Sequence, residues 1–392
     1  MSSIYLHIPF CKRRCFYCDF ITYAGKEYLT DRYIQAMLLE LEITAERLED
    51  KYKQIDTVYF GGGTPSLLKA DDVKKLLEQV AKCFYLSPEA EISLEANPGT
   101  ISKETFKSYL NAGVNRLSLG VQSFSDMELQ SLGRIHSKKE CVEAIETAKN
   151  SGFTNLSLDL MFGVPSQTPD GWQQNLETAL SLEPTHLSLY SLILEEGTPL
   201  FDAVQKGLVN IADDEETADM FENARYMLHA AGWQHYEISN WALHREYQSK
   251  HNKTYWLNGD WLGIGAAAHS HIGSCRFSNL ESPEAYIHAL AYPAQHNPSA
   301  TLSPAQVWVK ENDQLTEMRE TMMLGFRLVE EGINLKLFRE RYAEDAEKRF
   351  AKEIAYLKRR GLIEKINGGL GPRLRLREEA VAVANQVFEE FV

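Results

Sequence analysis

Strand-like and helix-like segments alternate along the first half of the chain, and this alternation restricts the fold more than any other feature of the sequence. Short runs of β-branched or alternating apolar residues predict strands, and longer segments with a helical pattern separate them. Such alternation predicts a parallel sheet with helices outside it. The predicted strands are Ile4–Ile8, Thr57–Phe60, Glu91–Glu95, Arg116–Leu119, Asn155–Leu160 and His186–Tyr190. The predicted helices are Asp31–Leu48, Asp71–Cys83, Ser102–Leu110, Lys138–Asn150 and Gly171–Leu180.

About six strand–helix repeats are too many for a small doubly wound unit, so we expect an α/β fold with a partial (β/α)6 barrel of the TIM type. Right-handed crossovers bring the carboxyl ends of the strands to one rim. Polar and glycine residues follow the strands in phase. Any one of them is an ordinary turn residue, but the whole set predicts a functional rim. These rim residues are Gly62, Gly63, Thr64, Glu95, Gln122 and Asp159.

The pattern divides the chain into three predicted parts. Residues 1–235 form the barrel, and residues 236–312 are aromatic-rich and loop-like, with the prolines of a linker within 293–304. Residues 313–392 have three helical segments and a glycine-rich hairpin, which predicts a winged-helix-like domain. Its predicted elements are Arg319–Val329, Leu335–Arg341, Ala346–Arg359, Gly361–Ile366 and Arg373–Arg377.

Composition restricts the class of protein. Hydrophobic residues make up 44% and charged residues 24% of the chain, which is the balance of a soluble globular protein. No apolar run reaches the roughly 20 residues that span a bilayer, and the N-terminus lacks a secretory signal pattern. The net charge of −14 disfavours nucleic acid as a partner, because phosphate contacts need a cationic surface. We therefore expect a cytoplasmic protein that binds no nucleic acid.

Three of the six cysteines lie within eight residues, as Cys11-x3-Cys15-x2-Cys18. Such clustering favours a metal site in a reducing compartment over a disulfide framework. An iron–sulfur cubane usually takes four thiolates. Three ligands leave one iron open to a non-protein ligand, so the spacing favours a 4Fe-4S cluster. Zinc is the alternative, and it would need a fourth ligand such as His7.

The segment from Tyr5 to Cys18, YLHIPFCKRRCFYC, resembles the signature of the radical S-adenosylmethionine superfamily. More closely, it is similar to the branch that contains oxygen-independent coproporphyrinogen III oxidase and related heme chaperones. The resemblance covers nearly the whole chain. It implies a radical SAM barrel in which S-adenosylmethionine chelates the open iron, and in which an electron from the cluster cleaves the sulfonium.

The resemblance also implies which residues meet the cofactor. Tyr5 and Tyr17 correspond to positions near the cluster, and the glycine-rich stretch corresponds to the one that meets the methionine amino end. Glycine lets the backbone approach a ligand closely. Carboxylates suit ribose hydroxyls or an ammonium group, and an arginine suits the methionine carboxylate. The implied cofactor-binding residues are Tyr5, Tyr17, Gly62, Gly63, Thr64, Glu95, Gln122, Arg134 and Asp159.

Two departures separate this chain from the oxidases of the branch. Those enzymes have another cysteine two residues after the third ligand, where this chain has Phe20, and they carry an N-terminal extension where this chain has ten residues before Cys11. We therefore expect no coproporphyrinogen oxidase activity. Oxidative decarboxylation by the oxidase mechanism remains the alternative function.

The segment His251-Asn-Lys-Thr-Tyr255-Trp resembles the HNxxY heme-binding motif of the heme chaperones. The resemblance implies that the chain binds heme and delivers it to acceptor proteins such as membrane-bound respiratory enzymes, with a possible role of the cluster in homodimer formation. Imidazole and phenolate both ligate heme iron, so His251 and Tyr255 remain alternatives. The other candidate histidines are His235, His269 and His271.

Overall fold

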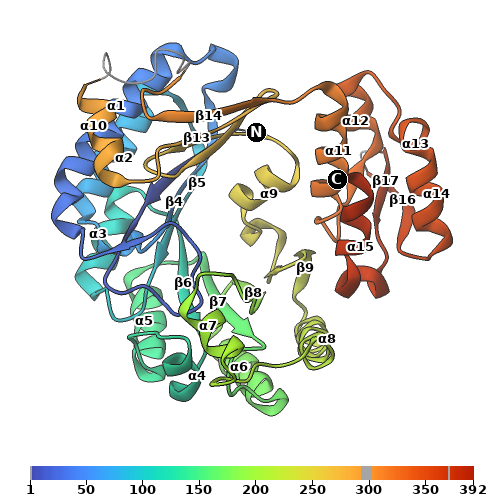
Figure 1. The fold of residues 1–392 in the computed structure, drawn as a ribbon, viewed down its shortest axis with the longest axis horizontal. Coiled ribbons are helices and arrows are strands. Elements are labelled where there is room, and N and C mark those ends of the chain that lie inside the picture. The colour runs from blue at the N-terminus through green and yellow to red at the C-terminus, as the bar shows by residue number, and fades with distance from the viewer. Residues whose placement is uncertain (1, 293–301, 370) are drawn as a thin grey trace.

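The structure is a computed structural model that describes residues 2–292, 302–369 and 371–392. Six strands run parallel in chain order in the middle of a 12-stranded sheet (Figure 1). The α/β partial barrel predicted from the sequence is therefore confirmed. The six strands are β1 (Ser2–Ile8), β4 (Gln54–Gly62), β5 (Tyr85–Ala96), β6 (Arg116–Gln122), β7 (Leu156–Phe162) and β8 (His186–Ser191).

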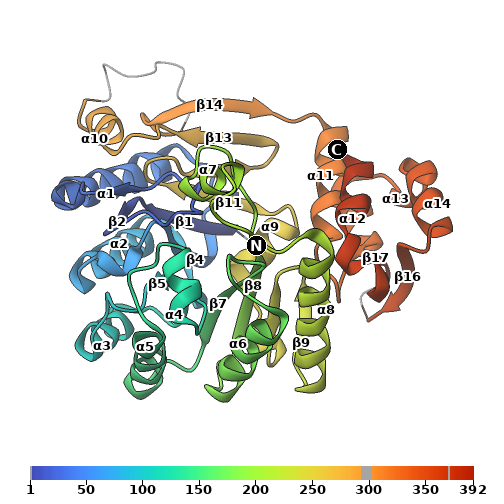
Figure 2. The same ribbon diagram turned by 60° about the horizontal axis from the view of Figure 1, so that its bottom comes forward.

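Helices cover the outer face of these strands, as Figure 2 shows. Their ends follow local capping rules. Ser137 and Glu140 form a capping box at the start of α5, and Gly152 ends that helix in a left-handed conformation. Among the described residues, no helix has the length and apolar composition needed to cross a membrane. The covering helices are α1 (Thr30–Arg47), α2 (Ala70–Cys83), α3 (Lys103–Ala112), α5 (Lys138–Ser151), α6 (Pro169–Ser181) and α8 (Asp214–Ala230).

The loop-like prediction for residues after 235 is wrong. This region adds strands to both ends of the same sheet, and β11 pairs in parallel with β1. The strands have three to six residues and contain buried polar groups, so they lack the apolar alternation that marks a strand in sequence. The added elements are β9 (Gln234–Glu237), β10 (Asn240–Ala242), α9 (Lys250–Trp256), β11 (Asp260–Ile264), β12 (His269–Ile272), β13 (Cys275–Asn279) and β14 (Gln306–Glu311).

The predicted linker falls after α10 (Pro283–Ala291). Pro293 and Pro298 lie outside the described residues, and Pro304 is a buried residue just before β14.

The C-terminal residues form a lobe beside the barrel (Figure 1). Three strands in the order β15-β17-β16 pack with helices around an apolar core of their own. The order helix, strand, three helical segments and hairpin is that of a winged-helix-like domain, so this part of the predicted fold is confirmed. Its elements are α11 (Gln314–Gly325), β15 (Ile333–Asn334), α12 (Leu335–Tyr342), α13 (Ala346–Arg349), α14 (Ala351–Arg359), β16 (Ile363–Gly368), β17 (Gly371–Leu376) and α15 (Asn385–Phe388).

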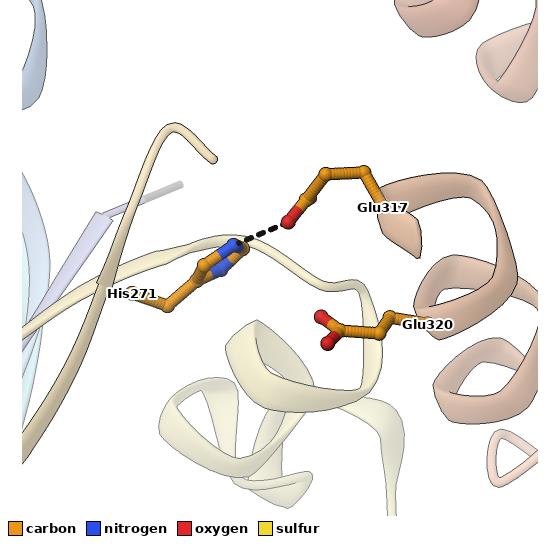
Figure 3. Close-up of side chains that lie close together, drawn as sticks. All are labelled: His271, Glu317 and Glu320. Carbon is orange, nitrogen blue, oxygen red and sulfur yellow. Dashed lines mark hydrogen bonds and ion pairs between the residues drawn. The ribbon is translucent and has the colours of Figure 1, made fainter. Parts of the chain in front are cut away.

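A buried polar cluster joins this lobe to the barrel (Figure 3). His271 on β12 lies 3.2 Å from Glu317 on α11, and Glu320 one turn later pairs with Arg276 on β13. Asn312 donates hydrogen bonds to both carboxylates. These charge-assisted contacts fix α11 against the end of the sheet.

Candidate functional site

The cysteine loop follows β1 directly. Its base is fixed where β2 (Phe10–Cys11) pairs with β3 (Tyr23–Ala24). Cys11, Cys15 and Cys18 are free thiols, and all three line one cavity of about 480 Å³ at the carboxyl ends of the strands. This volume lies in the usual range for small-molecule sites. For brevity we call it the cysteine cavity.

The three thiols are placed to act on one ligand. All of them line the same cavity, as the three ligands of one iron–sulfur cubane must. Within the described part of the chain, a tight group of three possible metal ligands is found elsewhere, at His271, Glu317 and Glu320.

Hydrogen-bond donors reach two of the sulfurs. The Thr64 hydroxyl donates to Cys11 Sγ and the Arg134 guanidinium donates to Cys15 Sγ, both at 3.4 Å. Burial raises the pKa of the Cys11 and Cys18 thiols. These thiols therefore favour the neutral form until a metal supplies positive charge nearby.

The glycine turn after β4 approaches the loop closely. Gly62 has φ of +114°, which favours glycine. A Cβ on Gly63 would lie 2.7 Å from the carbonyl oxygen of Phe10 and 2.9 Å from that of Ile8. Both glycines line the cysteine cavity, so the turn exposes backbone to any ligand held there.

Two partly buried carboxyl groups come from β5 and β7, which lie on either side of β6. Tyr59 donates a 2.8 Å hydrogen bond to Glu95, and the backbone NH of Gly62 donates another at 3.3 Å. Ser118 donates to Asp159 at 3.0 Å. Burial raises the pKa of Glu95 to about 7 and also raises that of Asp159. Both groups line the cysteine cavity.

Arg134 lines the cysteine cavity. Besides Cys15, its guanidinium donates to Gly120 O at 2.6 Å and to Asn97 Oδ1 at 2.9 Å. Among the residues that the structure describes, none accepts a hydrogen bond from its buried Nε. Gln122 lines the same cavity with φ of +66°. An orphaned buried donor in a cavity that two carboxyl groups also line fits a polar, zwitterionic ligand.

The structure brings together eleven of the twelve predicted cluster and cofactor residues in the cysteine cavity, and Tyr5 is the exception. Tyr5 lines an adjoining cavity of about 500 Å³, where its hydroxyl lies 3.0 Å from His7 Nδ1. We call it the aromatic cavity. Its lining is Tyr5, His7, Asp19, Phe20, Ile21, Gly62, Glu95, Tyr255, Trp261, Ala267 and His269.

The two cavities share a wall. Asp19, Phe20, Gly62 and Glu95 line both. Phe20 is 65% exposed, which is unusual for a phenylalanine and places its ring free between the two spaces. The loop that carries the cysteines thus also borders the aromatic cavity.

Of the two predicted heme-motif residues, one lines the aromatic cavity and the other lines neither this cavity nor the cysteine cavity. Tyr255 lines the aromatic cavity, with its ring 4.8 Å from Trp261 in an edge-on contact. His251 is 1% exposed and lies behind it, bonded to Tyr255 at 2.8 Å. Burial lowers the pKa of His251 to about 3, so its ring is neutral. Trp256, the next residue, does not line this cavity and packs on Arg327 instead.

The other candidate histidines are separated by the fold. His235 stacks on Trp241 at 4.0 Å in the core. His271 is bonded to Gly259 and Glu317 in the interdomain cluster (Figure 3). His269 is exposed and lines the aromatic cavity. His269 is therefore the one of these three that can meet a ligand there.

Several cavity residues were not predicted. They include Tyr59 on β4, Arg116 and Ser118 on β6, and Tyr190 on β8. Arg116 could have been found from the sequence, because it lies within a predicted apolar strand and a buried charged residue there is unusual. Ser118 is two positions further along the same strand and so lies on the same face.

Comparison with known proteins identifies the class. The Radical SAM superfamily model matches residues 5–179, and the HemN C-terminal domain model matches residues 312–377. Among solved structures, coproporphyrinogen III oxidase (HemN) from Escherichia coli superposes with a TM-score of 0.81 at 20% identity, over 100% of this chain and 89% of that one. This likeness shows a shared fold.

Curated relatives identify the family within this superfamily. Heme chaperone HemW of Bacillus subtilis is 36% identical over 100% of this chain and 99% of its own length. Heme chaperone HemW of Lactococcus lactis is 32% identical over 100% and 97%, and that of Escherichia coli is 38% identical over 78% and 81%. The chain belongs to the HemW family of the radical SAM superfamily, whose cofactors are a 4Fe-4S cluster and S-adenosylmethionine.

Proposed function

We propose that this protein is a heme chaperone, which binds heme and transfers it to acceptor proteins. One observation carries the proposal: an aromatic cavity large enough for a planar ligand adjoins the cavity that contains the three cysteines. Four aromatic side chains line it, namely Tyr5, Phe20, Tyr255 and Trp261. An apolar wall with a few polar groups is typical of a cofactor site.

The cofactors are assigned to the cysteine cavity. Cys11, Cys15 and Cys18 hold the 4Fe-4S cluster through their thiolates. When bound, S-adenosylmethionine would occupy the open iron and supply a cleavable sulfonium. The protein contributes polar contacts from the rim around it. The residues assigned to this ligand are Tyr5, Tyr17, Gly62, Gly63, Thr64, Glu95, Gln122, Arg134 and Asp159.

In this proposal each of three parts of the chain has its own role. Residues 1–235 hold the cluster and S-adenosylmethionine, residues 236–312 supply Tyr255 and His269 to the heme site, and residues 313–392 brace the barrel from one side. The acceptors include membrane-bound respiratory enzymes, and the chaperone acts in the cytoplasm as a monomer or a homodimer.

Oxygen-independent coproporphyrinogen III oxidation is the second candidate. The fold likeness to HemN over the whole chain favours it, as does a complete set of polar groups in the cysteine cavity. Phe20 stands against it, because its ring occupies the wall where the oxidases of this branch have a further cysteine.

A paired measurement separates the two functions. The cluster is reconstituted without oxygen, and the protein is then assayed for stoichiometric heme binding and for conversion of coproporphyrinogen III to protoporphyrinogen. Heme uptake without decarboxylation supports the chaperone. Robust turnover of the porphyrinogen would overturn it.

A further inference from the structure

The polar cluster between the C-terminal lobe and the barrel has the residue types of a metal site. His271 on β12 and Glu317 and Glu320 on α11 each offer a ligand atom, and these three atoms lie within 4.8 Å of one another. His271 and Glu317 are buried and Glu320 is partly buried. Figure 3 shows both carboxylates pointing towards the imidazole ring. Imidazole nitrogen and carboxylate oxygen are common ligands of zinc and other divalent transition metals.

One oxygen of each carboxylate, its Oε1 atom, faces the middle of this cluster. Glu317 Oε1 lies 3.2 Å from His271 Nε2 and 2.9 Å from the side-chain amide nitrogen of Asn312. Glu320 Oε1 lies 3.1 Å from the same amide nitrogen. Two ligands of one ion, each bonded at about 2.1 Å, lie about 3.0–3.4 Å apart. The four side chains therefore need little movement to surround a metal ion.

The other oxygen of each carboxylate, its Oε2 atom, is held from outside the cluster. Arg276 Nε donates to Glu320 Oε2 at 3.0 Å. The amide of Asn258 donates to Glu317 Oε2 at 3.2 Å, and Arg341 lies 3.5 Å from the same atom. Donors of this kind orient metal-binding carboxylates in other proteins. These contacts leave the two Oε1 atoms directed at the imidazole and at Asn312.

The orientation of His271 is also that of a metal ligand. Its Nδ1 lies 2.9 Å from the carbonyl oxygen of Gly259, and a carbonyl can only accept, so Nδ1 carries a hydrogen and donates it. A backbone carbonyl bound to the far nitrogen is typical of histidines that ligate metals. Nε2 then faces Glu317 Oε1, which is itself an acceptor. A proton or a metal ion must therefore lie between these two atoms.

Asn312 supplies an independent observation. It is 5% exposed, and among the residues that the structure describes none donates a hydrogen bond to its Oδ1 atom. A buried acceptor without a donor is rare in folded proteins. Rotation of the amide group by 180° exchanges its oxygen with its nitrogen and brings Oδ1 to the two Oε1 atoms. Three oxygens can meet there only around a cation, which would also give Oδ1 its missing partner.

We propose that this cluster binds one divalent transition metal ion, such as Zn²⁺, between the barrel and the C-terminal lobe. On binding, His271 Nε2 releases any proton it carries to solvent, and no atom changes its oxidation state. The ion would fix β12 and the segment after β14 to α11. None of these residues lines either cavity, so the site is separate from the cluster and heme sites. The proposed ligands are His271 Nε2, Glu317 Oε1, Glu320 Oε1 and Asn312 Oδ1.

The experiment uses the full chain with its iron–sulfur cluster reconstituted, so that Cys11, Cys15 and Cys18 are occupied. Zn²⁺ is titrated in a calorimeter without oxygen, and zinc and iron are counted after gel filtration. We expect one Zn²⁺ per chain with the iron content unchanged. Glu320→Gln should weaken Zn²⁺ binding at least about tenfold. Glu340→Gln, at an exposed position on α12 of the same lobe, is the matched control and should bind Zn²⁺ as the wild type does.

A second variant distinguishes a metal ligand from a residue that only holds the lobe in place. Asn312→Asp presents a charged oxygen in either orientation of the side chain, so it should bind Zn²⁺ about tenfold more tightly than the wild type. Without metal it should be less stable, because three carboxylates then meet. This variant also keeps the test decisive if Glu320→Gln fails to fold.

Thermal unfolding gives a second measurement. Zn²⁺ should raise the unfolding temperature of the wild type, and by more at higher Zn²⁺ concentration, because the ion binds only the folded chain. The rise should be smaller for Glu320→Gln at the same concentration.

Three outcomes would overturn the proposal. They are a wild-type protein that binds no Zn²⁺, equal Zn²⁺ affinity in the wild type and Glu320→Gln, and an Asn312→Asp variant that binds Zn²⁺ no more tightly than the wild type. Neither cavity takes part in this site, so none of these outcomes bears on the proposed heme function.

Discussion

Tyr59 donates its hydroxyl hydrogen to the carboxyl group of Glu95 across two neighbouring parallel strands, at 2.8 Å. The bond holds Glu95 at the wall common to both cavities. Burial raises the pKa of this carboxyl group, and the hydrogen bonds from Tyr59 and Gly62 lower it. The effect of burial is the larger, so the pKa of Glu95 rises to about 7.

This raised pKa predicts an unusual pH dependence of stability. The folded protein binds the Glu95 proton more tightly than the unfolded chain, so its contribution is fully present below pH 4.5 and is lost as the pH rises to about 7. Urea unfolding of cofactor-free protein should show Glu95→Gln to be more stable than the wild type at pH 8, by on the order of 2 kcal/mol after allowance for solvent in the cavity.

The wild type and Glu95→Gln should be equally stable near pH 4.5. If the free energy of unfolding changes with pH in the same way for both proteins between pH 5 and 7, Glu95 is ionised in the folded protein. The pKa of Asp159 is also raised, so the free energy of unfolding of the variant should still depend on pH to some extent.

Changing any one of Cys11, Cys15 or Cys18 to alanine should abolish cluster retention, because a cubane with two protein thiolates is poorly held. Iron and acid-labile sulfide are measured after anaerobic reconstitution. Cys83→Ala is the matched control, since that cysteine ends α2 away from the cavity. Full iron content in the triple variant would remove the basis of the cofactor assignment.

The glycine turn should tolerate no side chain at Gly63. A methyl group there would meet backbone oxygen atoms at 2.7 Å and 2.9 Å, so Gly63→Ala must displace the cysteine loop at a loss of roughly 1–3 kcal/mol. Both the unfolding midpoint and the S-adenosylmethionine affinity should fall. Gly369→Ala, at a site with open space around it, should change neither.

Phe20 should contribute to heme affinity without affecting the cluster. Loss of one aromatic contact is worth about 0.5–1.5 kcal/mol, so Phe20→Ala should weaken heme binding by roughly two- to twelvefold. Tyr28→Ala removes another exposed ring, at 75% exposure and away from both cavities, and should have no effect. Equal affinities for the two variants would exclude Phe20 from the heme site.

The interdomain cluster predicts acid sensitivity. Although burial acts in the opposite direction, hydrogen bonds from His271 and Asn312 lower the pKa of Glu317. Its stabilisation is therefore present above pH 4.5 and is lost as the pH falls through the lower folded value. Glu317→Ala should lose roughly 1–3 kcal/mol at pH 7, because it leaves the buried His271 and Asn312 without a hydrogen-bond partner on α11.

Calorimetry of the wild type and Glu317→Ala from pH 3 to 8 checks this. The exposed Glu340→Ala is the control. If the variant and the wild type unfold alike at pH 7, the cluster does not brace the lobe.

The barrel and the cysteine cavity could be predicted because their signals are local. The cysteine spacing lies within one loop. Glu95 and Gln122 lie at the ends of strands whose apolar pattern is plain, and Asp159 lies within the next such strand, β7. Parallel pairing in chain order then brings these ends together without further information.

The aromatic cavity could not be predicted in the same way. It combines Tyr5 with Tyr255 and His269, and the contact depends on β11 pairing beside β1. That pairing joins segments more than 250 positions apart, and the short polar strands involved have no clear pattern. The seclusion of His251 behind Tyr255 is likewise a tertiary effect that HNxxY alone does not reveal.

The pairing of β1 with β11 also imposes an order of assembly during translation. The cysteine cavity is bounded almost wholly by residues up to 195, whereas the aromatic cavity requires residues 255 to 269. While the ribosome is still adding the later residues, the first strand lacks its β11 neighbour. The residues that hold the iron–sulfur group are therefore synthesised before those that complete the aromatic cavity.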